Sequence, residues 1–270
     1  MIDANLSAFL AELCLTRAGL RLDVEKGYLI ESRLGPVARR EGYASPEIFI
    51  EALKAGGEER LAWAAVEAMI MPEGEFFSDR AVFAKLVDEV LPALVSARNG
   101  EPVRVWSAAC GTGQEIYSLA MLLHDAGKLA ERVELYASDL SQRSLEKAQA
   151  GLYSQFEVQR GLPARLLVRH FEKRGESFAL SPRIRQMVRW RRVNLMEDLS
   201  RYGPFDLVLC RNMLGQMTAE AQAHGRSSLR AALSPAGRLV LGRRDEAGDL
   251  APLEPEIGLF GAAGLTRSAA

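Results

Sequence analysis

A glycine-rich turn is the part of this sequence best suited to bind a ligand. Residues 103–118 read VRVWSAACGTGQEIYS: a run of β-branched residues, then Gly111-Thr112-Gly113, and then a helical pattern. Glycines let the backbone approach a ligand that a Cβ would keep away, and a helix that starts there leaves N–H groups unpaired. Taken alone, the glycine pair fits an ordinary turn between a strand and a helix equally well.

Asp139 indicates what the turn could bind. It ends a second predicted strand, 26 residues beyond Gly113. An acid in that place can accept both hydroxyls of a ribose bound over the turn, as in nicotinamide-dependent dehydrogenases and S-adenosylmethionine (SAM) methyltransferases. Ile116 replaces the third glycine that a dinucleotide requires, so the sequence favours a mononucleoside such as SAM. A buried carboxylate at Glu115 would suit the cationic sulfonium of that ligand.

The composition predicts a soluble cytoplasmic protein. With a formal net charge of -1 over 270 residues, a dedicated nucleic-acid binder is not expected. Three widely spaced cysteines, Cys14, Cys110 and Cys210, give no zinc or disulfide pattern and fit a reducing compartment. With only three histidines, His124, His170 and His224, no His-based metal site or catalytic triad is expected. No apolar run approaches the roughly 20 residues needed to span a bilayer, and the N-terminus does not resemble a signal peptide.

The first part of the chain is predicted to be helical. Residues 1–70 have helical periodicity, with Asn5 or Ser7 as the first cap, further helices over 26–40 and 58–70, and one that starts at Pro46. They predict a small all-helical N-terminal domain. Residues 71–102 are predicted to be a linker and a connecting helix over 80–97. The adjacent Phe76 and Phe77 fit either core anchors or one wall of a pocket between two domains.

From residue 103 the chain alternates between strands and helices. The predicted strands cover 103–107, 133–137, 205–210 and 238–241, and the predicted helices 114–126, 145–150 and 219–233. This alternation predicts an α/β domain over 103–270 with a doubly wound parallel sheet. Ligands bind such sheets outside the carboxyl ends of the strands. Gly111, Gly113, Asp139 and the pair Arg211-Asn212 all fall at such ends.

Two basic segments could face an acidic partner. Between residues 160 and 192 there are ten Lys and Arg but two Glu, and short strand-like pieces at 177–180 and 187–190 predict a small β insertion over about 154–192. In the N-terminal domain, Arg33, Arg39 and Arg40 lie on one predicted helix. Each segment fits a solvated surface or a docking surface for an acidic partner.

Motifs along nearly the whole chain resemble one family. YLIESRL at 28–34 looks like its second helix, WSAACGTGQEIYS at 106–118 resembles W-S-A-x-C-S-T-G-E-E-P-Y-S, and CRNML at 210–214 resembles C-R-N-V-L. EFFSD at 75–79, SDL at 138–140, NL at 194–195 and the LSPAG…G ending at 233–242 fall in the same order. The sequence thus resembles the CheR family, the chemotaxis protein-glutamate methyltransferases.

The resemblance implies a class I SAM-dependent methyltransferase domain with an all-helical N-terminal domain and a small β insertion. It implies SAM as cofactor, S-adenosylhomocysteine as product, and a chemoreceptor or other acidic signalling protein as partner, with docking by Arg33, Arg39 and Arg40. No membrane insertion is expected. The cofactor contacts that the resemblance implies are Ala109, Glu115, Asp139, Asn194, Leu195, Arg211 and Asn212.

The sequence departs from the family where the reaction occurs. The family's Asn, Thr and Arg stand here as Pro72, Gly74 and Ser78, and its Tyr near the transferred methyl is Gln216. The family's catalytic positions thus fall on Ser78 and Gln216, and serine cannot replace the charge-assisted hydrogen bonds of arginine. Two hypotheses follow. The chain is either a working glutamate methyltransferase, or a catalytically impaired pseudo-methyltransferase that binds SAM or S-adenosylhomocysteine and acts as a regulatory or receptor-binding module.

Overall fold

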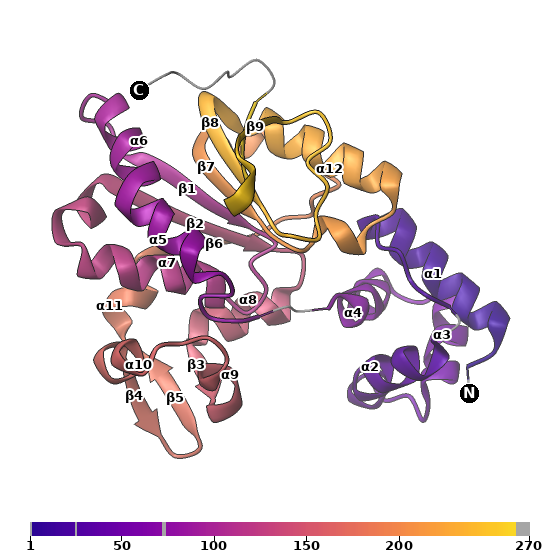
Figure 1. Ribbon diagram of the computed structural model, residues 1–270. Helices are drawn as coiled ribbons and strands as arrows, with labels where there is room; N and C mark the ends of the chain where they lie inside the picture. The colour runs from indigo at the N-terminus through magenta and orange to yellow at the C-terminus, as the bar shows by residue number, and fades with distance from the viewer. Residues whose placement is uncertain (1, 25, 72–73, 263–270) are drawn as a thin grey trace. The chain divides into compact units, whose positions relative to one another are not determined.

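The computed structural model describes residues 2–24, 26–71 and 74–262, in two compact units (Figure 1). The first unit comprises the described residues of Met1–Met71 together with Leu214–Gly225. The second comprises those of Pro72–Met213 and Arg226–Ala270. The linker and connecting helix expected over 71–102 therefore fall almost entirely within the second unit.

The first unit is helical, as the sequence predicts. It contains α1 (Ala4–Ala18), α2 (Gly27–Arg40), α3 (Pro46–Lys54), α4 (Glu59–Met69) and η4 (Leu214–Gln216). Ser45 caps α3 by accepting a hydrogen bond from Ile48 N–H, next to Pro46 at the first helical position. The predicted cap of α1 was wrong: Asp3, whose carboxylate accepts from Asn5 N–H at 2.6 Å, takes that place instead of Asn5 or Ser7.

The segment after α4 joins the core of the second unit. The helix predicted over 80–97 is helical throughout, with a π-helical turn in its middle: α5 (Arg80–Lys85), η1 (Leu86–Val90) and α6 (Leu91–Ala97) follow one another without a gap. Phe76 and Phe77 are both buried. The Phe76 ring lies 5.0 Å from that of Tyr153, and the Phe77 ring 5.6 Å from that of Phe83. Of the two interpretations of this aromatic pair, the structure supports core anchors.

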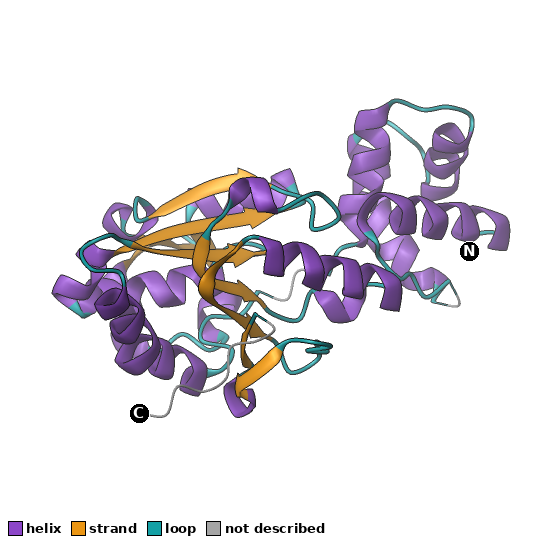
Figure 2. Ribbon diagram, turned by 90° about the horizontal axis from the view of Figure 1, so that it is seen from above, coloured by secondary structure: helices purple, strands orange, loops and turns teal. Residues whose placement is uncertain are grey.

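A seven-stranded sheet forms the centre of the second unit, in the order β6-β2-β1-β7-β8-β10-β9. The first five strands are parallel, and β10 is antiparallel to both β8 and β9. This arrangement confirms the predicted doubly wound α/β class, and helices lie on both faces of the sheet (Figure 2). The strands are β1 (Val103–Ala108), β2 (Val133–Asp139), β6 (Val188–Arg192), β7 (Phe205–Cys210), β8 (Leu233–Leu241), β9 (Ala251–Glu254) and β10 (Leu259–Gly261).

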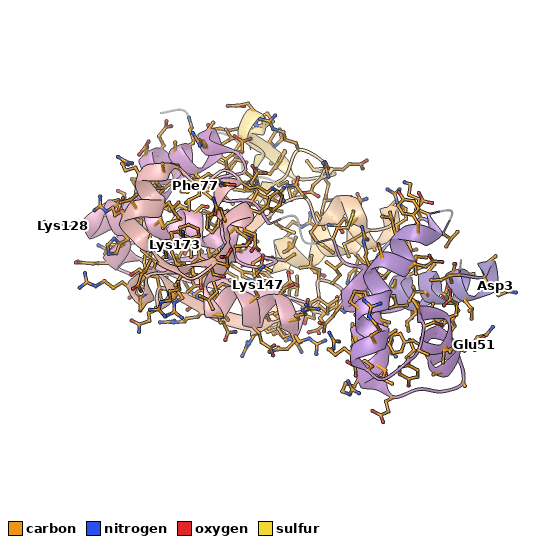
Figure 3. All side chains as sticks on the ribbon, turned by 90° about the horizontal axis from the view of Figure 1, so that it is seen from below. Asp3, Glu51, Phe77, Lys128, Lys147 and Lys173 are labelled. Atoms are coloured by element: carbon orange, nitrogen blue, oxygen red, sulfur yellow. The ribbon has the colours of Figure 1, made fainter. Side chains whose placement is uncertain are left out.

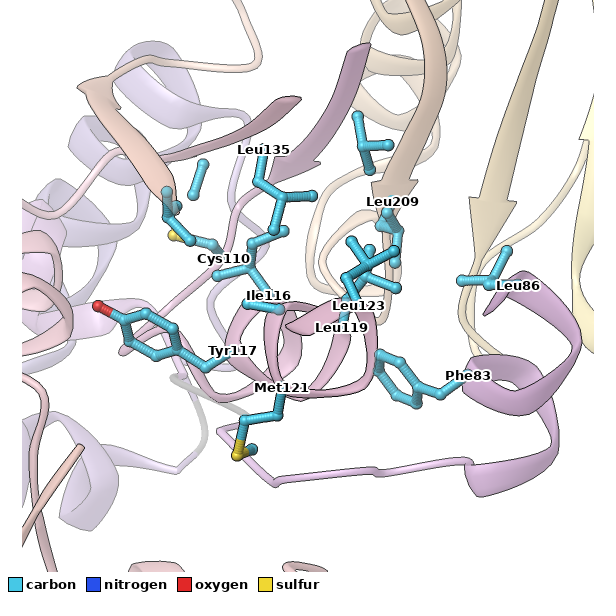
Figure 4. Close-up of a cluster of buried hydrophobic side chains, with 14 of the residues drawn as sticks. Phe83, Leu86, Cys110, Ile116, Tyr117, Leu119, Met121, Leu123, Leu135 and Leu209 are labelled. Carbon is cyan, nitrogen blue, oxygen red and sulfur yellow. The ribbon is translucent and has the colours of Figure 1, made fainter. Parts of the chain in front are cut away.

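The helices that connect these strands supply much of the core. Ile116, Leu119 and Leu123 of α7 (Gln114–Asp125) point toward Leu135 of β2 and Leu209 of β7 (Figure 4). Their spacing of three and four residues puts them on one face of the helix, which explains why α7 packs flat against the sheet. The other connections between these strands contain η2 (Gly127–Arg132), α8 (Gln142–Ala150), η3 (Ser200–Tyr202), α12 (Ala219–Ala231) and η5 (Pro255–Ile257).

The β insertion is a separate three-stranded antiparallel sheet in the order β3-β5-β4. Its basic strand β4 is exposed from Glu172 to Arg174, with Lys173 labelled in Figure 3. Its elements are β3 (Leu152–Ser154), α9 (Gln155–Gln159), α10 (Ala164–His170), β4 (Phe171–Arg174), β5 (Ser177–Leu180) and α11 (Pro182–Arg185).

Two predicted elements differ in the structure. The strand expected at 187–190 is not part of the insertion, because β6 pairs in parallel with β2 at the edge of the large sheet. Val188 of β6 is buried while Arg189 and Arg191 are exposed, which is the pattern of an ordinary edge strand. The many basic residues around it made this strand look like part of the basic insertion. The helix expected to reach 233 ends at Ala231, and β8 starts at Leu233. Its pairing with β7 shifts from Phe205–Leu233 to Leu207–Arg238, so the predicted turn at 235–237 is an irregularity within this strand.

Among the residues that the structure describes, none of the helices is both long enough and apolar enough to cross a membrane.

Candidate functional site

The glycine loop after β1 has an open side and a packed side. Ala109, Gly111 and Gly113 all have positive φ angles of 55°, 55° and 89°. A Cβ added to Gly111 would meet nothing within 4 Å, whereas one added to Gly113 would lie 3.0 Å from Ala148 Cβ and 3.2 Å from Trp190. Gly113 therefore allows α7 to start close to its neighbours, and Gly111 leaves space for a ligand to approach the backbone.

Asp139 holds this loop in place. Its side chain is buried, and its Oδ2 accepts a hydrogen bond from Gly111 N–H at 2.8 Å while Oδ1 accepts from Ser141 N–H at 2.8 Å. The loop is also tied to β2 through Cys110 N–H, which donates to the carbonyl oxygen of Ser138. A carboxylate oxygen has two lone pairs, so an oxygen that accepts one N–H can also accept a ribose hydroxyl.

A buried ion pair joins the start of α7 to the end of β7. Arg211 donates from Nη1 to Glu115 Oε2 at 2.9 Å and to Ser78 Oγ at 2.8 Å. The side chain of Arg211 is 5% exposed and that of Glu115 18%. Burial raises the pKa of Glu115, and the neighbouring Arg211 opposes that shift. Arg211 Nε is buried and makes no hydrogen bond with any described residue, so a donor remains for a ligand.

Asn212 sits beside a carboxylate that the sequence analysis missed. Asn212 has φ 63°, and its N–H donates to Asp245 Oδ2 at 2.5 Å, while Gly242 N–H donates to the same oxygen at 2.9 Å. Asp245 thus fixes the ends of β7 and β8 together, as Asp139 fixes those of β1 and β2. The signal that pointed to Asp139, an acid just beyond a strand's carboxyl end, would have found it.

The segment after β6 completes the edge of the site. Val193 N–H donates to the carbonyl oxygen of Asp139 at 3.1 Å, so Asn194 and Leu195 follow directly from a contact with that residue. Leu195 is buried, and Asn194 Oδ1 accepts from Met196 N–H at 3.1 Å. The structure therefore gathers the predicted cofactor positions at the carboxyl ends of β1, β2, β6 and β7.

The positions that depart from the family have new neighbours. A Cβ on Gly74 would lie 2.6 Å from the side-chain nitrogen of Gln114 and 2.7 Å from its oxygen, so Gln114 fills the space that the family's Thr would need. Ser78 Oγ is the acceptor for Arg211 described above. Pro72 lies outside the described residues.

Gln216 belongs to the first unit, in η4. Its side-chain amide pairs with the backbone of Met71: Oε1 accepts from Met71 N–H at 3.1 Å, and Nε2 donates to the Met71 carbonyl oxygen at 3.2 Å. Two further backbone bonds join the same region to the turn after α1, Arg21 N–H to the Gln216 carbonyl and Thr218 N–H to the Gly19 carbonyl. Gln216 therefore holds the end of α4 to η4, which is a structural contact.

The three predicted docking arginines of α2 differ in their surroundings. Arg33 donates from Nη1 to the Met69 carbonyl oxygen at 3.2 Å, which ties α2 to α4. Arg40 pairs with Glu41 at 2.9 Å. Arg39 is exposed, and no carboxylate of the described chain forms an ion pair with it. Of the three, Arg39 therefore has the charge most accessible to a partner.

The sheet order, the open glycine loop and the acid after β2 together define an α/β SAM-dependent methyltransferase. Residues 73–252 match the family described as CheR methyltransferase, SAM binding domain. The chain belongs to the CheR methyltransferase family, and SAM is its cofactor.

Curated relatives match over most of their length. The chain is 34% identical to chemotaxis protein methyltransferase 1 of Pseudomonas aeruginosa over 250 residues, covering 90% of this chain and 89% of that protein. It is 33% identical to the chemotaxis protein methyltransferase of Vibrio parahaemolyticus, covering 88% and 86%. A solved structure, magnesium protoporphyrin IX methyltransferase from Synechocystis with bound SAH, aligns with a TM-score of 0.32 and 24% identity over 60% of this chain and 56% of its own.

The ion pair between Arg211 and Glu115 predicts a stability change. Glu115→Gln removes the charge that compensates a buried guanidinium, so the free energy of unfolding at pH 7 should fall by about 3 kcal/mol. Adding Arg211→Met should recover part of the loss, because the uncompensated charge is then gone. Urea denaturation measures both changes. Glu134→Gln, which breaks the exposed pair with Arg189, is the control and should cost less than about 1 kcal/mol. An equal cost for Glu115→Gln and Glu134→Gln would contradict this interpretation.

Proposed function

We propose that this chain transfers the methyl group of SAM to glutamate side chains of chemoreceptor proteins. The observation that carries the proposal is the organised edge of the sheet, where Asp139 anchors an open glycine loop and Arg211 keeps an unpartnered buried donor. Family membership supports the reaction type, and relatives along nearly the whole chain are named chemotaxis protein methyltransferases.

The cofactor contacts are part of this proposal. Asp139 would accept the ribose hydroxyls, and the backbone at Ala109 and Gly111 would face the nucleoside across the open side of the loop. Glu115 would counter the positive charge of the methionine end, and Arg211 Nε would donate to its carboxylate. The full set comprises Ala109, Glu115, Asp139, Asn194, Leu195, Arg211 and Asn212.

Methyl transfer to a carboxylate requires mainly that the protein position the two reactants. A glutamate carboxylate has a pKa of about 4.3 and is already ionised at neutral pH, so the acceptor needs no general base. SAM supplies a methyl group on a sulfonium: the carboxylate oxygen forms a bond to that carbon, the carbon–sulfur bond breaks, and neutral ester and neutral thioether result. The protein's part is to hold the two groups in line. Activity is therefore compatible with serine at 78 and glutamine at 216.

The second candidate, a pseudo-methyltransferase that binds the cofactor and acts as a regulatory or receptor-binding module, has specific support as well. Gln114 occupies the space beside Gly74, and Gln216 is engaged with the backbone of Met71. Neither glutamine side chain carries the hydroxyl group that the family's Thr and Tyr place near the reacting groups. We favour the active enzyme because these changes affect groups that position the reactants, and none removes a group that takes part in bond making.

We further propose that the protein acts in the cytoplasm, on the cytoplasmic part of the receptor. Its three cysteines, Cys14, Cys110 and Cys210, are all free and buried, which fits a reducing compartment. The acidic region around the target glutamates is the proposed partner of the basic face of α2.

Methyl transfer is tested with labelled SAM and the cytoplasmic fragments of the organism's own chemoreceptors. The proposal predicts label on the receptor that is released as methanol by alkali, because a methyl ester hydrolyses in base. Ser78→Arg combined with Gln216→Tyr should raise the rate above that of the parent. If the parent binds S-adenosylhomocysteine but labels none of the receptors, while the double variant labels them, the pseudo-methyltransferase is the correct assignment.

Docking through α2 is tested by charge reversal. Arg39→Glu should weaken binding to the receptor fragment, and the difference from the parent should shrink as salt is raised from low to physiological concentration. Lys54→Glu, an equal change on an exposed residue of α3, is the matched control and should have a smaller effect. Surface plasmon resonance at several salt concentrations measures both. Equal losses for the two variants would exclude a specific role for α2.

A further inference from the structure

The ends of two helices bring three potential metal ligands together, away from the cofactor site. His124 and Asp125 are the last residues of α7, and His170 is the last residue of α10 in the insertion. One ligand atom from each, His124 Nδ1, Asp125 Oδ1 and His170 Nε2, lies within 4.8 Å of the others. The 12 residues of α7 separate this cluster from the glycine loop by about 18 Å at 1.5 Å per residue.

These three atoms are buried, and their polar contacts among the described residues are ion pairs centred on Asp125 Oδ1. His170 is 4% exposed. His170 Nε2 lies 3.2 Å and His124 Nδ1 3.6 Å from Asp125 Oδ1, and Arg169 Nε lies 3.1 Å from the same oxygen. Buried polar atoms are almost always hydrogen-bonded. Among the described residues the two histidine nitrogens converge only on Asp125, and this arrangement around one carboxylate oxygen fits a site that a cation completes.

The distances between the ligand atoms suit a tetrahedral transition metal. Zinc is bound by imidazole nitrogen at about 2.0–2.1 Å and by carboxylate oxygen at similar length, which places neighbouring ligand atoms about 3.3 Å apart. The two distances to Asp125 Oδ1, 3.2 and 3.6 Å, already match two edges of such a tetrahedron. The two histidine nitrogens lie within 4.8 Å of each other, and the side chain of His124, which is 36% exposed, has room to adjust the third edge.

The electrostatic setting also favours a cation. The carbonyl ends of α7 and α10 both terminate at the cluster, and the C-terminus of a helix carries partial negative charge. Arg169 competes for the same carboxylate, since its Nε lies 3.1 Å from Asp125 Oδ1. That side chain is 56% exposed, so it can swing into solvent when a metal binds.

We propose that His124, Asp125 and His170 bind one divalent transition metal ion, with zinc as the best fit and a water as the fourth ligand. The ion would join the end of α7, whose other end starts at the glycine loop, to α10 of the insertion. It would thereby fix the small β subdomain to the helix that carries the cofactor loop, in a structural role.

The full-length chain, stripped with EDTA, is titrated with Zn²⁺ by calorimetry and with Co²⁺ by absorption spectroscopy. We expect one ion per chain and a tetrahedral Co²⁺ spectrum without a thiolate charge-transfer band, because the ligands are nitrogen and oxygen. A thiolate band would mean that cysteine binds the metal, and it would overturn the proposal. Hydrogen exchange of the backbone in 164–174 should slow when Zn²⁺ is present.

Variants identify the ligands. His124→Gln, at the partly exposed position, should weaken Zn²⁺ binding by at least about tenfold, the loss typical of removing even an outer partner of a metal site. His170→Gln should do the same, and thermal melting of the metal-free variant shows whether it still folds. His224→Gln on α12 is the control: it leaves two histidines in the chain, as the other two variants do, and should bind Zn²⁺ as the parent does.

Arg169→Gln separates a metal site from an ordinary charge cluster. If the site binds a metal, removing the competing guanidinium should tighten Zn²⁺ binding. If Arg169, Asp125 and His170 instead hold the insertion as an ion-pair cluster without a metal, Arg169→Gln should destabilise the fold and leave the affinity for Zn²⁺ unchanged. No stoichiometric binding by the parent would overturn the proposal. So would equal losses in His124→Gln and His224→Gln.

Discussion

The hydrogen bonds of one carboxylate organise the cofactor edge of this protein. Asp139, at the end of β2, binds the N–H groups of Gly111 in the glycine loop and of Ser141 at the start of α8, while its carbonyl accepts from Val193 after β6. Three connections of the sheet therefore converge on one residue. Buried and satisfied networks of this kind are rigid, because each member would lose its partner if another moved.

Polar side chains with hydrogen-bond partners surround two of the positions where the chain departs from the family, Gly74 and Ser78. Gln114 is buried, accepts a hydrogen bond from Thr112 and fills the space next to Gly74, and Arg211 shares one nitrogen between Glu115 and Ser78. Simple decay would leave cavities or uncompensated charge. Ser78 and Gln216 instead both have hydrogen-bond partners, so these two departures leave no buried polar group unpaired.

The sequence predicts those parts of the fold that depend on local chemistry. The apolar spacing in α7, the β-branched β1 and the capping pair Ser45-Pro46 each specify their element without tertiary information. Elements whose environment depends on distant partners could not be predicted. The edge strand β6 looked like part of the basic insertion because only its pairing with β2 reveals that Val188 faces the core. The role of Gln216 could not be predicted either, since the backbone of Met71 reaches it through folding alone.

The central claim is that Asp139 and the loop it anchors form an intact cradle for the nucleoside of SAM. Calorimetric titration of the purified protein with S-adenosylhomocysteine tests it most directly, with Asp139→Ala as the variant and the exposed Asp198→Ala as the control. We predict that the parent and the control bind alike and that Asp139→Ala binds at least about tenfold more weakly, because bonds to a charged acceptor contribute about 1.5–3 kcal/mol. Failure of the parent to bind, or unchanged affinity in a folded Asp139→Ala variant, would contradict the account.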